Sequence, residues 1–253
     1  MTTRARGWPF AAAARGLLAF LFVLSALIAL PSLAAPAPGR AAIATAHPLA
    51  TEAGHEILAR GGNAFDAAVA ISAALAVVEP NGSGLGGGGF YLLHRASDAR
   101  EVLVDAREVA PAAATADMFL DADGNPVEGL STRHAKAAGI PGEPAGWQHL
   151  ATKYGRLPLA ASLEPAIRLA REGFVLSERM HEDLARTLED EGLVGGGQGE
   201  FARIYLVKGR PPPVGHRLRL PDLARSLEAL AKGGADAFYE GPLARRLVKG
   251  VQE

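Results

Sequence analysis

The segment that most restricts the fold of this chain is AFDAAVAISAALAVV, residues 64–78. Asn63 precedes it and Asp66 follows three residues later, the spacing of a helix N-terminal capping box, so we predict a helix from Ala64. Only Asp66 and Ser72 are polar, and a helix that is apolar on all sides needs cover from lipid or from protein. Because fifteen residues fall short of the roughly 20 that span a bilayer, we predict a buried helix whose alanines admit close neighbours.

The next segment, 81-NGSGLGGGGFYLLH-94, contains the pattern G-x-G-x-x-G twice. A dinucleotide-binding fingerprint needs the order strand, glycine turn, helix, so that the pyrophosphate meets the N-terminus of the helix. Here the glycines follow a predicted helix and precede a predicted strand, and no lysine completes a phosphate-binding loop. We therefore predict no nucleotide site, and we interpret the glycines as serving positive φ angles or the close approach of another segment.

The rest of the pattern predicts helices around one hairpin. Leu49, Ala53 and Ile57 lie four apart and predict a helix from Pro48 to Arg60, which the following two glycines end. FYLLHR and REVLVDAR, separated by the turn ASDA, predict an antiparallel hairpin. We also expect a short buried strand over 41–46, a flexible loop over 192–200, and a strand and surface crossing over 201–218. Further helices are expected over 146–155, 157–173, 176–190, 221–234 and 242–253. The helix over 157–173 is expected to be kinked or restarted at Pro165.

The N-terminus has the composition of a secretory signal peptide. Arg4, Arg6 and Arg15 precede an apolar run over 16–30, and Pro31 and small residues follow it. We expect a signal peptide over 1–35, cleaved after Ala34 or Ala35, a linker over 36–40 and a domain over 41–253; an uncleaved membrane anchor is the alternative. The chain is therefore expected to be exported, to a bacterial periplasm, with membrane contact through the signal peptide only.

Composition excludes several kinds of chemistry. The chain has no cysteine, which removes disulfides, thiolate metal sites and a cysteine nucleophile. Its formal net charge of −1, which becomes −4 once the three N-terminal arginines are removed, gives no reason to expect nucleic acid. The seven histidines form no metal-binding pair, and we expect neither metal nor cofactor.

Two short motifs resemble functional sites, but their residues do not match the pattern that each kind of site requires. Asp121, Asp123 and Asn125 resemble the start of a calcium loop, but proline stands where its glycine is required, so we predict a turn. Ser83 lies between glycines, but G-S-G-L-G lacks the spacing and the strand-to-helix order of a nucleophile elbow. No catalytic nucleophile is evident in this chain.

Arg107 is the one candidate binding residue. It follows an apolar strand in LVDAREVAP, next to Glu108. It can form an ordinary ion pair with a nearby carboxylate, or it can present the two-pronged guanidinium to the carboxylate of a ligand. Residue chemistry alone favours the ion pair.

Several long segments together resemble one family, in one order along residues 41–250. They are HPLATEAGHEILARGGNAFDAAVAISAALAVVEP, GSGLGGGGF, VDAREVAPAAATADMFLDADGNP, AGIPGEPAGWQHLATKYGRLPL, PAIRLAREGFVLSE and LPDLARSLEALAKGGADAFYEGPLA. The sequence is similar to the N-terminal part of γ-glutamyltranspeptidases, also called glutathione hydrolases.

The resemblance implies an α+β fold, the αββα sandwich of N-terminal-nucleophile hydrolases, of which this chain holds only the large-subunit part. It implies a precursor that cleaves itself, with the new N-terminal threonine of the small subunit as nucleophile. That threonine attacks glutathione or another γ-glutamyl compound and passes the acyl group to water, an amino acid or a peptide. The arginine of the R-E-x-A-P motif, here Arg107, is implied to grip the α-carboxylate of the glutamyl group.

The nucleophilic threonine of this family lies beyond the residues of this sequence, so we expect no γ-glutamyl hydrolysis by this chain alone. We expect it to act with a small catalytic subunit from the same precursor. Two alternatives stay open: a related acylase acting on cephalosporin side chains, and a non-catalytic protein that binds an amino-acid-like ligand or a partner subunit.

Overall fold

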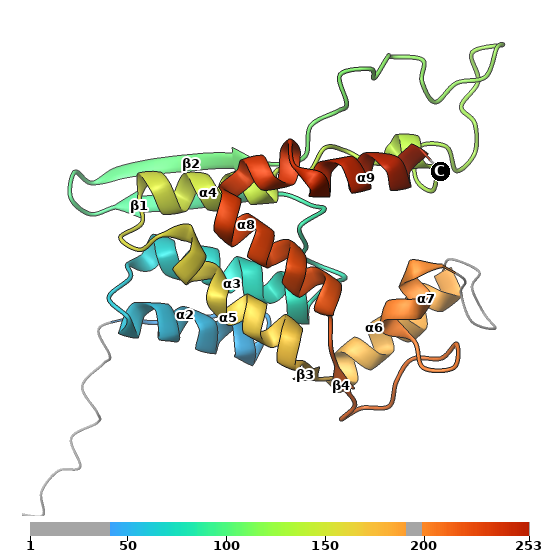
Figure 1. Cartoon of the computed structure of the whole chain (residues 1–253). Coiled ribbons are helices and arrows are strands. Elements are labelled where there is room, and N and C mark those ends of the chain that lie inside the picture. Colours follow the sequence, from blue (N-terminus) through green and yellow to red (C-terminus); the bar gives the residue numbers. More distant parts are fainter. Residues whose placement is uncertain (1–40, 191–198, 253) are drawn as a thin grey trace, which may run out of the picture. The chain divides into compact units, whose positions relative to one another are not determined.

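The computed structural model describes residues 41–190 and 199–252 (Figure 1). The predicted signal peptide, the linker over 36–40 and most of the loop over 192–200 lie outside the described residues. The described elements belong to one unit, residues 43–253.

Two helices open this unit, where the sequence predicts them. Helix α2 (Pro48–Ala59) begins after His47, whose Nδ1 accepts a hydrogen bond from the backbone N–H of Leu49, and it ends at Arg60. Helix α3 (Ala64–Val78) has the predicted capping box: the Asn63 side chain accepts from the N–H of Asp66, and the Asp66 side chain accepts from the N–H of Asn63.

Helix α3 is buried as predicted. It contacts α2, α4 (Glu143–Lys153) and α5 (Leu159–Glu172), which cover different parts of its surface. Five of its small apolar side chains are fully inaccessible: Val69, Ala70, Ala73, Ala74 and Val77. The short side chains let the neighbouring helices approach closely, which explains a helix with almost no polar face. Among the described helices, none combines the length and hydrophobicity needed to cross a membrane.

The predicted hairpin consists of β1 (Gly89–Arg95) and β2 (Arg100–Ala106), paired antiparallel with Leu92 opposite Leu103. Strand β2 lies against α4, and Figure 1 shows the hairpin on the far side of α4 from α5. Side chains alternate between its two faces: Tyr91 and Leu93 point into the core, whereas Leu92 is 74% exposed. One face of the hairpin is therefore covered by helices and the other lies open.

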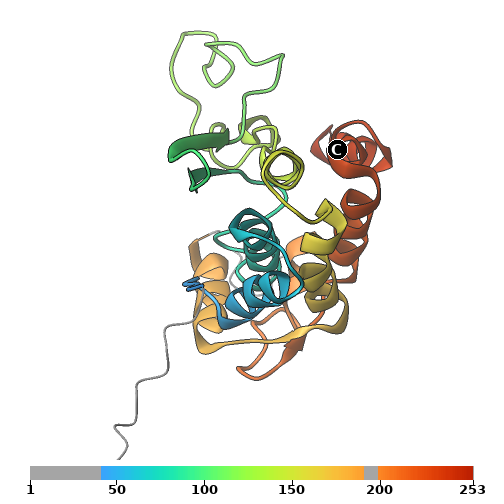
Figure 2. The ribbon, with the colours of Figure 1, turned by 90° about the vertical axis from the view of Figure 1, so that its left-hand side faces the viewer.

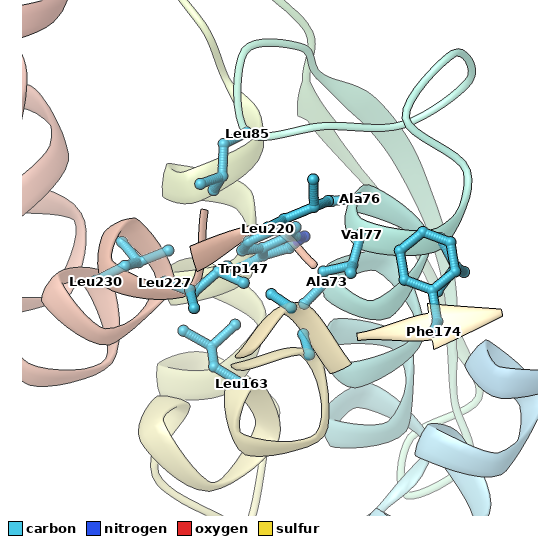
Figure 3. Close-up of a cluster of buried hydrophobic side chains, with 14 of the residues drawn as sticks. Ala73, Ala76, Val77, Leu85, Trp147, Leu163, Phe174, Leu220, Leu227 and Leu230 are labelled. Atoms are coloured by element: carbon cyan, nitrogen blue, oxygen red, sulfur yellow. The ribbon is translucent and has the colours of Figure 1, made fainter. Parts of the chain in front are cut away.

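The main core lies where α3, α4, α5 and α8 (Pro221–Tyr239) meet. Figure 3 shows Trp147 at its centre, with Leu163 and Leu227 nearby. All three side chains are fully buried. The core also includes Phe174 and Leu218, which pair in a second small sheet formed by β3 (Phe174–Val175) and β4 (Arg217–Leu218).

The remaining elements are α6 (Glu178–Asp190), α7 (Glu200–Tyr205), α9 (Pro242–Gln252) and a short 3-10 helix, Ala135–Ala137. Between β2 and that short helix the chain forms turns, and Figure 2 shows this connection running away from the helices. In the described part of the chain, helices and two antiparallel sheets make a mixed α+β fold, as predicted.

Two details of the sequence prediction are wrong. Residues 41–46 form no strand, because no strand in the described part of the chain pairs with them. Residues 201–205 are helical, since Phe201 and Tyr205, four residues apart, both pack against the core. Helix α5 contains Pro165 without a restart, so of the two predicted effects of this proline only a kink stays a prediction. The predicted stop of the 221–234 helix at its glycines is confirmed: the backbone is non-helical at Gly234 (φ +66°), where two helices within the α8 range meet across a kink.

Asp66 ties the start of α3 to a distant turn. It is fully buried, and its carboxylate accepts hydrogen bonds from the backbone N–H groups of Asn63, Arg156 and Leu157. Asp66→Ala leaves these buried donors without their acceptor, so we expect a loss of about 3 kcal/mol in the free energy of unfolding. Urea unfolding of dilute protein measures it. As a control, the exposed Asp123→Ala is expected to change stability by less than about 0.5 kcal/mol; equal losses for the two variants would contradict the assignment.

Candidate functional site

The structure places Arg107 immediately after β2, at the edge of the open hairpin face. Its side chain is 60% exposed, and its Nε lies 3.1 Å from Glu108 Oε2, so the ordinary ion pair is present. Its backbone N–H donates to Asp105 Oδ1 at 3.0 Å, and its guanidinium carbon lies 5.9 Å from the centre of the Phe90 ring. These contacts hold the backbone of Arg107 and the Nε side of its guanidinium group.

The other side of the guanidinium is available to a ligand. Nη1 and Nη2 of Arg107 have no hydrogen-bond partner among the described residues. A guanidinium held through Nε can present its two outer nitrogens to the two oxygens of a carboxylate. The ion pair with Glu108 uses Nε, so it does not prevent Arg107 from binding a carboxylate ligand through its other two nitrogens.

A cleft of about 460 Å³ adjoins Arg107. Its polar lining includes Asp105 and Arg107 from the hairpin end, His149 from α4 and Tyr239 from the end of α8. Ile140 and Gly142, just before α4, form part of its wall. The cleft thus combines a cation, an anion and two side chains that can donate and accept hydrogen bonds, which suits a small polar ligand.

Tyr239 and His149 were not predicted from the sequence as site residues. The Tyr239 hydroxyl donates to the carbonyl of Pro141 at 2.8 Å and accepts from the N–H of Ala145 at 3.3 Å. Burial, and to a smaller extent the nearby carboxylate of Glu143, raise the pKa of Tyr239. Both residues lie in segments that resemble the family, but no motif marks them as site residues, and they reach the cleft through the packing of α4 and α8. Asp105 was not singled out either, although its position two residues before Arg107 could have indicated that it lies near the site.

A buried polar cluster lies at the start of α4, beside Gly142 of the cleft wall. The side chain of Glu143, in the first turn of α4, is largely buried, and its Oε1 accepts hydrogen bonds from Ser72 on α3, Tyr91 on β1 and Trp147 on α4. Burial, followed by the negative charge of Glu143, raises the pKa of the Tyr91 hydroxyl far above its ordinary value, so this hydroxyl stays a donor. The cluster joins a helix, a strand and the start of α4.

The glycine run contacts the backbone of the site. The carbonyl of Gly87 accepts hydrogen bonds from the N–H groups of Gly142 and Glu143, at 3.0 and 3.1 Å. A Cβ on Gly88 would lie 2.3 Å from the carbonyl oxygen of Ala106, so this position requires glycine for close approach, as the sequence analysis anticipated. The described glycines over 82–89 all lack positive φ, and Gly82, Gly84 and Gly86 have space for a side chain.

The other motifs occupy structural places. Asp121 Oδ1 accepts from the N–H groups of Asp123 and Asn125, which confirms the predicted turn; these bonds lower the pKa of Asp121, the one from Asn125 most. His94 pairs with Glu101 across the hairpin, and His181 Nδ1 lies 2.7 Å from the carbonyl oxygen of Pro212. Within residues 41–190 and 199–252, no group of three His, Cys, Asp or Glu side chains is arranged to hold a metal ion.

Comparison with known proteins agrees with the resemblance. The family model described as gamma-glutamyltranspeptidase matches residues 50–253. The glutathione hydrolase proenzyme of Escherichia coli (strain K12) is 41% identical over 211 residues, 83% of this chain and 36% of that protein. The acylase ACY 1 proenzyme of Pseudomonas sp. (strain V22) is also 41% identical, over 223 residues, 84% of this chain and 38% of that protein.

Solved structures give the same result. The crystal structure of Helicobacter pylori gamma-glutamyltranspeptidase superposes with a TM-score of 0.77 at 38% identity, covering 84% of this chain and 61% of that one. The chain spans about a third of the length of the curated relatives it matches. The α+β fold predicted from the resemblance, that of the N-terminal-nucleophile hydrolases, is therefore the fold of this chain. Family model, sequence relatives and solved structures agree, and the chain belongs to the γ-glutamyltranspeptidase family.

Proposed function

We propose that this chain supplies the substrate-gripping part of a γ-glutamyltransferase or glutathione hydrolase. The observation that carries the proposal is Arg107, which stands in the motif R-E-V-A-P with its outer guanidinium nitrogens free beside a cleft of about 460 Å³. In this proposal those nitrogens bind the α-carboxylate of the γ-glutamyl group of glutathione or a related compound. A bidentate, charge-assisted contact of this kind fixes both the position and the orientation of the substrate.

The nucleophile is proposed to come from a companion part of the precursor. In the proposed reaction an N-terminal threonine attacks the γ-amide carbonyl, the leaving amine departs, and water or an amino acid or peptide takes the γ-glutamyl group from the threonine oxygen. The present chain contributes binding and orientation of the donor. We also propose export through the signal peptide, which N-terminal sequencing of the chain recovered from the periplasm tests.

The experiment compares two proteins. The first is this chain alone. The second joins this chain to the part of the E. coli glutathione hydrolase proenzyme that follows the aligned region; we call it the complemented enzyme. With γ-glutamyl-p-nitroanilide as donor, we expect nitroaniline release by the complemented enzyme and none by the chain alone. Turnover by the chain alone would overturn the division of roles, and a complemented enzyme that matures but leaves the donor intact would overturn the activity.

A related acylase activity is the second candidate, because the acylase ACY 1 proenzyme matches this chain at the same 41% identity. The two candidates differ in what they require of the donor: the γ-glutamyl activity uses the α-carboxylate, and an acylase for other amides has no need of it. A complemented enzyme that hydrolyses butyryl-p-nitroanilide, which has no α-carboxylate, as well as γ-glutamyl-p-nitroanilide would favour the acylase. Failure of both reactions in a correctly matured protein would favour a non-catalytic binding role.

A further inference from the structure

We propose that Gly88 and Gly142 are positioning residues for Arg107: they hold the Ala106–Arg107 backbone between them and so fix where the guanidinium stands. This inference rests on the proposed role of Arg107 in donor binding. It concerns residues from two segments, the glycine run before β1 and the start of α4, which meet only in the folded chain.

Steric contact with the Ala106–Arg107 backbone leaves no room for a side chain at either glycine. A Cβ added to Gly142 would lie 2.2 Å from the carbonyl oxygen of Ala106 and 2.5 Å from that of Arg107. A Cβ on Gly88 would lie 2.3 Å from the Ala106 oxygen and 2.8 Å from Arg107 Cα. The clashing atoms belong to the backbone, so no change of side-chain rotamer relieves them. Gly142 has φ −104°, and Gly88 is not among the positive-φ glycines, so space rather than backbone conformation requires glycine here.

We call Gly88, Gly142 and the Ala106–Arg107 backbone that they contact the clamp. Backbone hydrogen bonds join it to neighbouring segments both before β1 and after Arg107. The N–H groups of Gly142 and Glu143 share the carbonyl of Gly87, which ties the two glycine segments to each other. On the other side of Arg107, Val109 and Ile140 exchange two backbone hydrogen bonds of 3.1 and 2.8 Å. The segment 139–142 is thus fixed to the chain before β1 and to the chain after Arg107.

The buried Glu143 cluster keeps the clamp from moving as a unit. Glu143 immediately follows Gly142, and its carboxylate is bonded to Ser72, Tyr91 and Trp147 in the core. The chain can therefore keep the Arg107 side chain exposed for a ligand while its backbone is held from two sides. A binding group on such a support loses less conformational freedom when the ligand arrives.

The test uses the complemented enzyme and two donors: γ-glutamyl-p-nitroanilide and its analogue without the α-carboxylate, 4-aminobutyryl-p-nitroanilide. The measured quantity is donor preference, the ratio of their kcat/KM values. Gly142→Ala is expected to reduce donor preference roughly tenfold or more, mainly through KM of the γ-glutamyl donor, since displacement by about 1 Å can cost up to 10²-fold. Gly86→Ala, at a glycine with nothing within 4 Å of its added Cβ, is the matched control and is expected to leave donor preference unchanged.

A second pair of variants covers the case in which Gly142→Ala does not fold. A Cβ on Gly146 would lie 2.7 Å from Ala106 Cβ, a contact that removal of the Ala106 side chain relieves. Gly146→Ala is therefore expected to lower donor preference, and Gly146→Ala/Ala106→Gly is expected to restore most of it. A purely structural role would lower kcat/KM for both donors together and leave their ratio unchanged.

The outcomes separate this inference from the function on which it rests. If Arg107→Ala lowers donor preference while Gly142→Ala and Gly146→Ala, both folded by circular dichroism, do not, the clamp is overturned and the role of Arg107 stands. If Arg107→Ala leaves donor preference unchanged, the carboxylate-binding role falls and the clamp falls with it. A loss of donor preference in all three variants, with rescue in the double variant, supports both.

Discussion

Arg107→Ala is expected to lower kcat/KM of the complemented enzyme for γ-glutamyl-p-nitroanilide by roughly 10²- to 10³-fold. A bidentate contact between a guanidinium and a carboxylate consists of two charge-assisted hydrogen bonds, and losing both leaves the ligand carboxylate unpaired in the cleft. About 3–4 kcal/mol of lost binding in the transition state corresponds to this change in rate. The donor lacking the α-carboxylate is expected to lose less than about threefold, because it never makes the contact.

Two further variants show whether charge or geometry matters. Arg107→Lys keeps the charge but lacks the two-pronged fork, so we expect an intermediate loss for the γ-glutamyl donor. Arg100→Ala is the matched control, because Arg100 begins the strand that ends just before Arg107, is 72% exposed and forms an ion pair with Asp98 at 3.5 Å. Equal effects of Arg107→Ala on both donors would contradict carboxylate binding and would leave the ion pair with Glu108 as the role of Arg107.

The sequence predicts the parts of this fold that depend on neighbouring residues. The capping box of Asn63 and Asp66 and the period-two pattern around the 96–99 turn locate α3 and the hairpin correctly. Local pattern fails at residues 201–205, where FARIY has the composition of a strand. There the packing of Phe201 and Tyr205 on the core selects a helix. Tertiary contacts override weak local preference in such short segments.

In the candidate site too, the sequence predicts residues that belong to a local motif and misses residues that only packing brings together. Arg107 is recognisable because its motif is local and belongs to a family. His149 and Tyr239 come to the cleft from helices whose spacing reports only which face is apolar. The glycine run illustrates the limit most clearly, because its letters repeat a nucleotide-binding pattern while only Gly88 among them meets backbone at close range. Which glycine matters depends on Ala106 and Arg107, and the sequence does not reveal that proximity.

The second large effect concerns the open face of the hairpin. Phe90, Leu92 and Leu103 are 59%, 74% and 62% exposed, and Leu92 faces Leu103 across the two strands. An apolar sheet face of this kind normally packs on another layer. Because the chain is expected to act with a companion part of the precursor, we expect that part to cover this face. The chain alone is then expected to bind a hydrophobic dye and to self-associate.

Leu92→Ser/Leu103→Ser tests this expectation. In the chain alone, the double variant is expected to reduce dye fluorescence several-fold and to raise the monomer fraction in analytical ultracentrifugation, because it removes the apolar centre of the face. In the complemented enzyme the same change is expected to cost about 3–6 kcal/mol of packing, from two leucines at roughly 1.5–3 kcal/mol each, and so to lower the yield of matured enzyme.

The opposite face of the same strand provides the control. Leu93 is 6% exposed and packs into the core of this chain, so Leu93→Ser is expected to unfold the chain with or without its companion. The Leu92 and Leu103 variant should instead leave the circular dichroism of the chain unchanged, because these side chains contribute little to its own core. If the unaltered chain is a monomer that melts in one sharp transition and binds no dye, the open face needs no cover and the companion must contact the chain elsewhere.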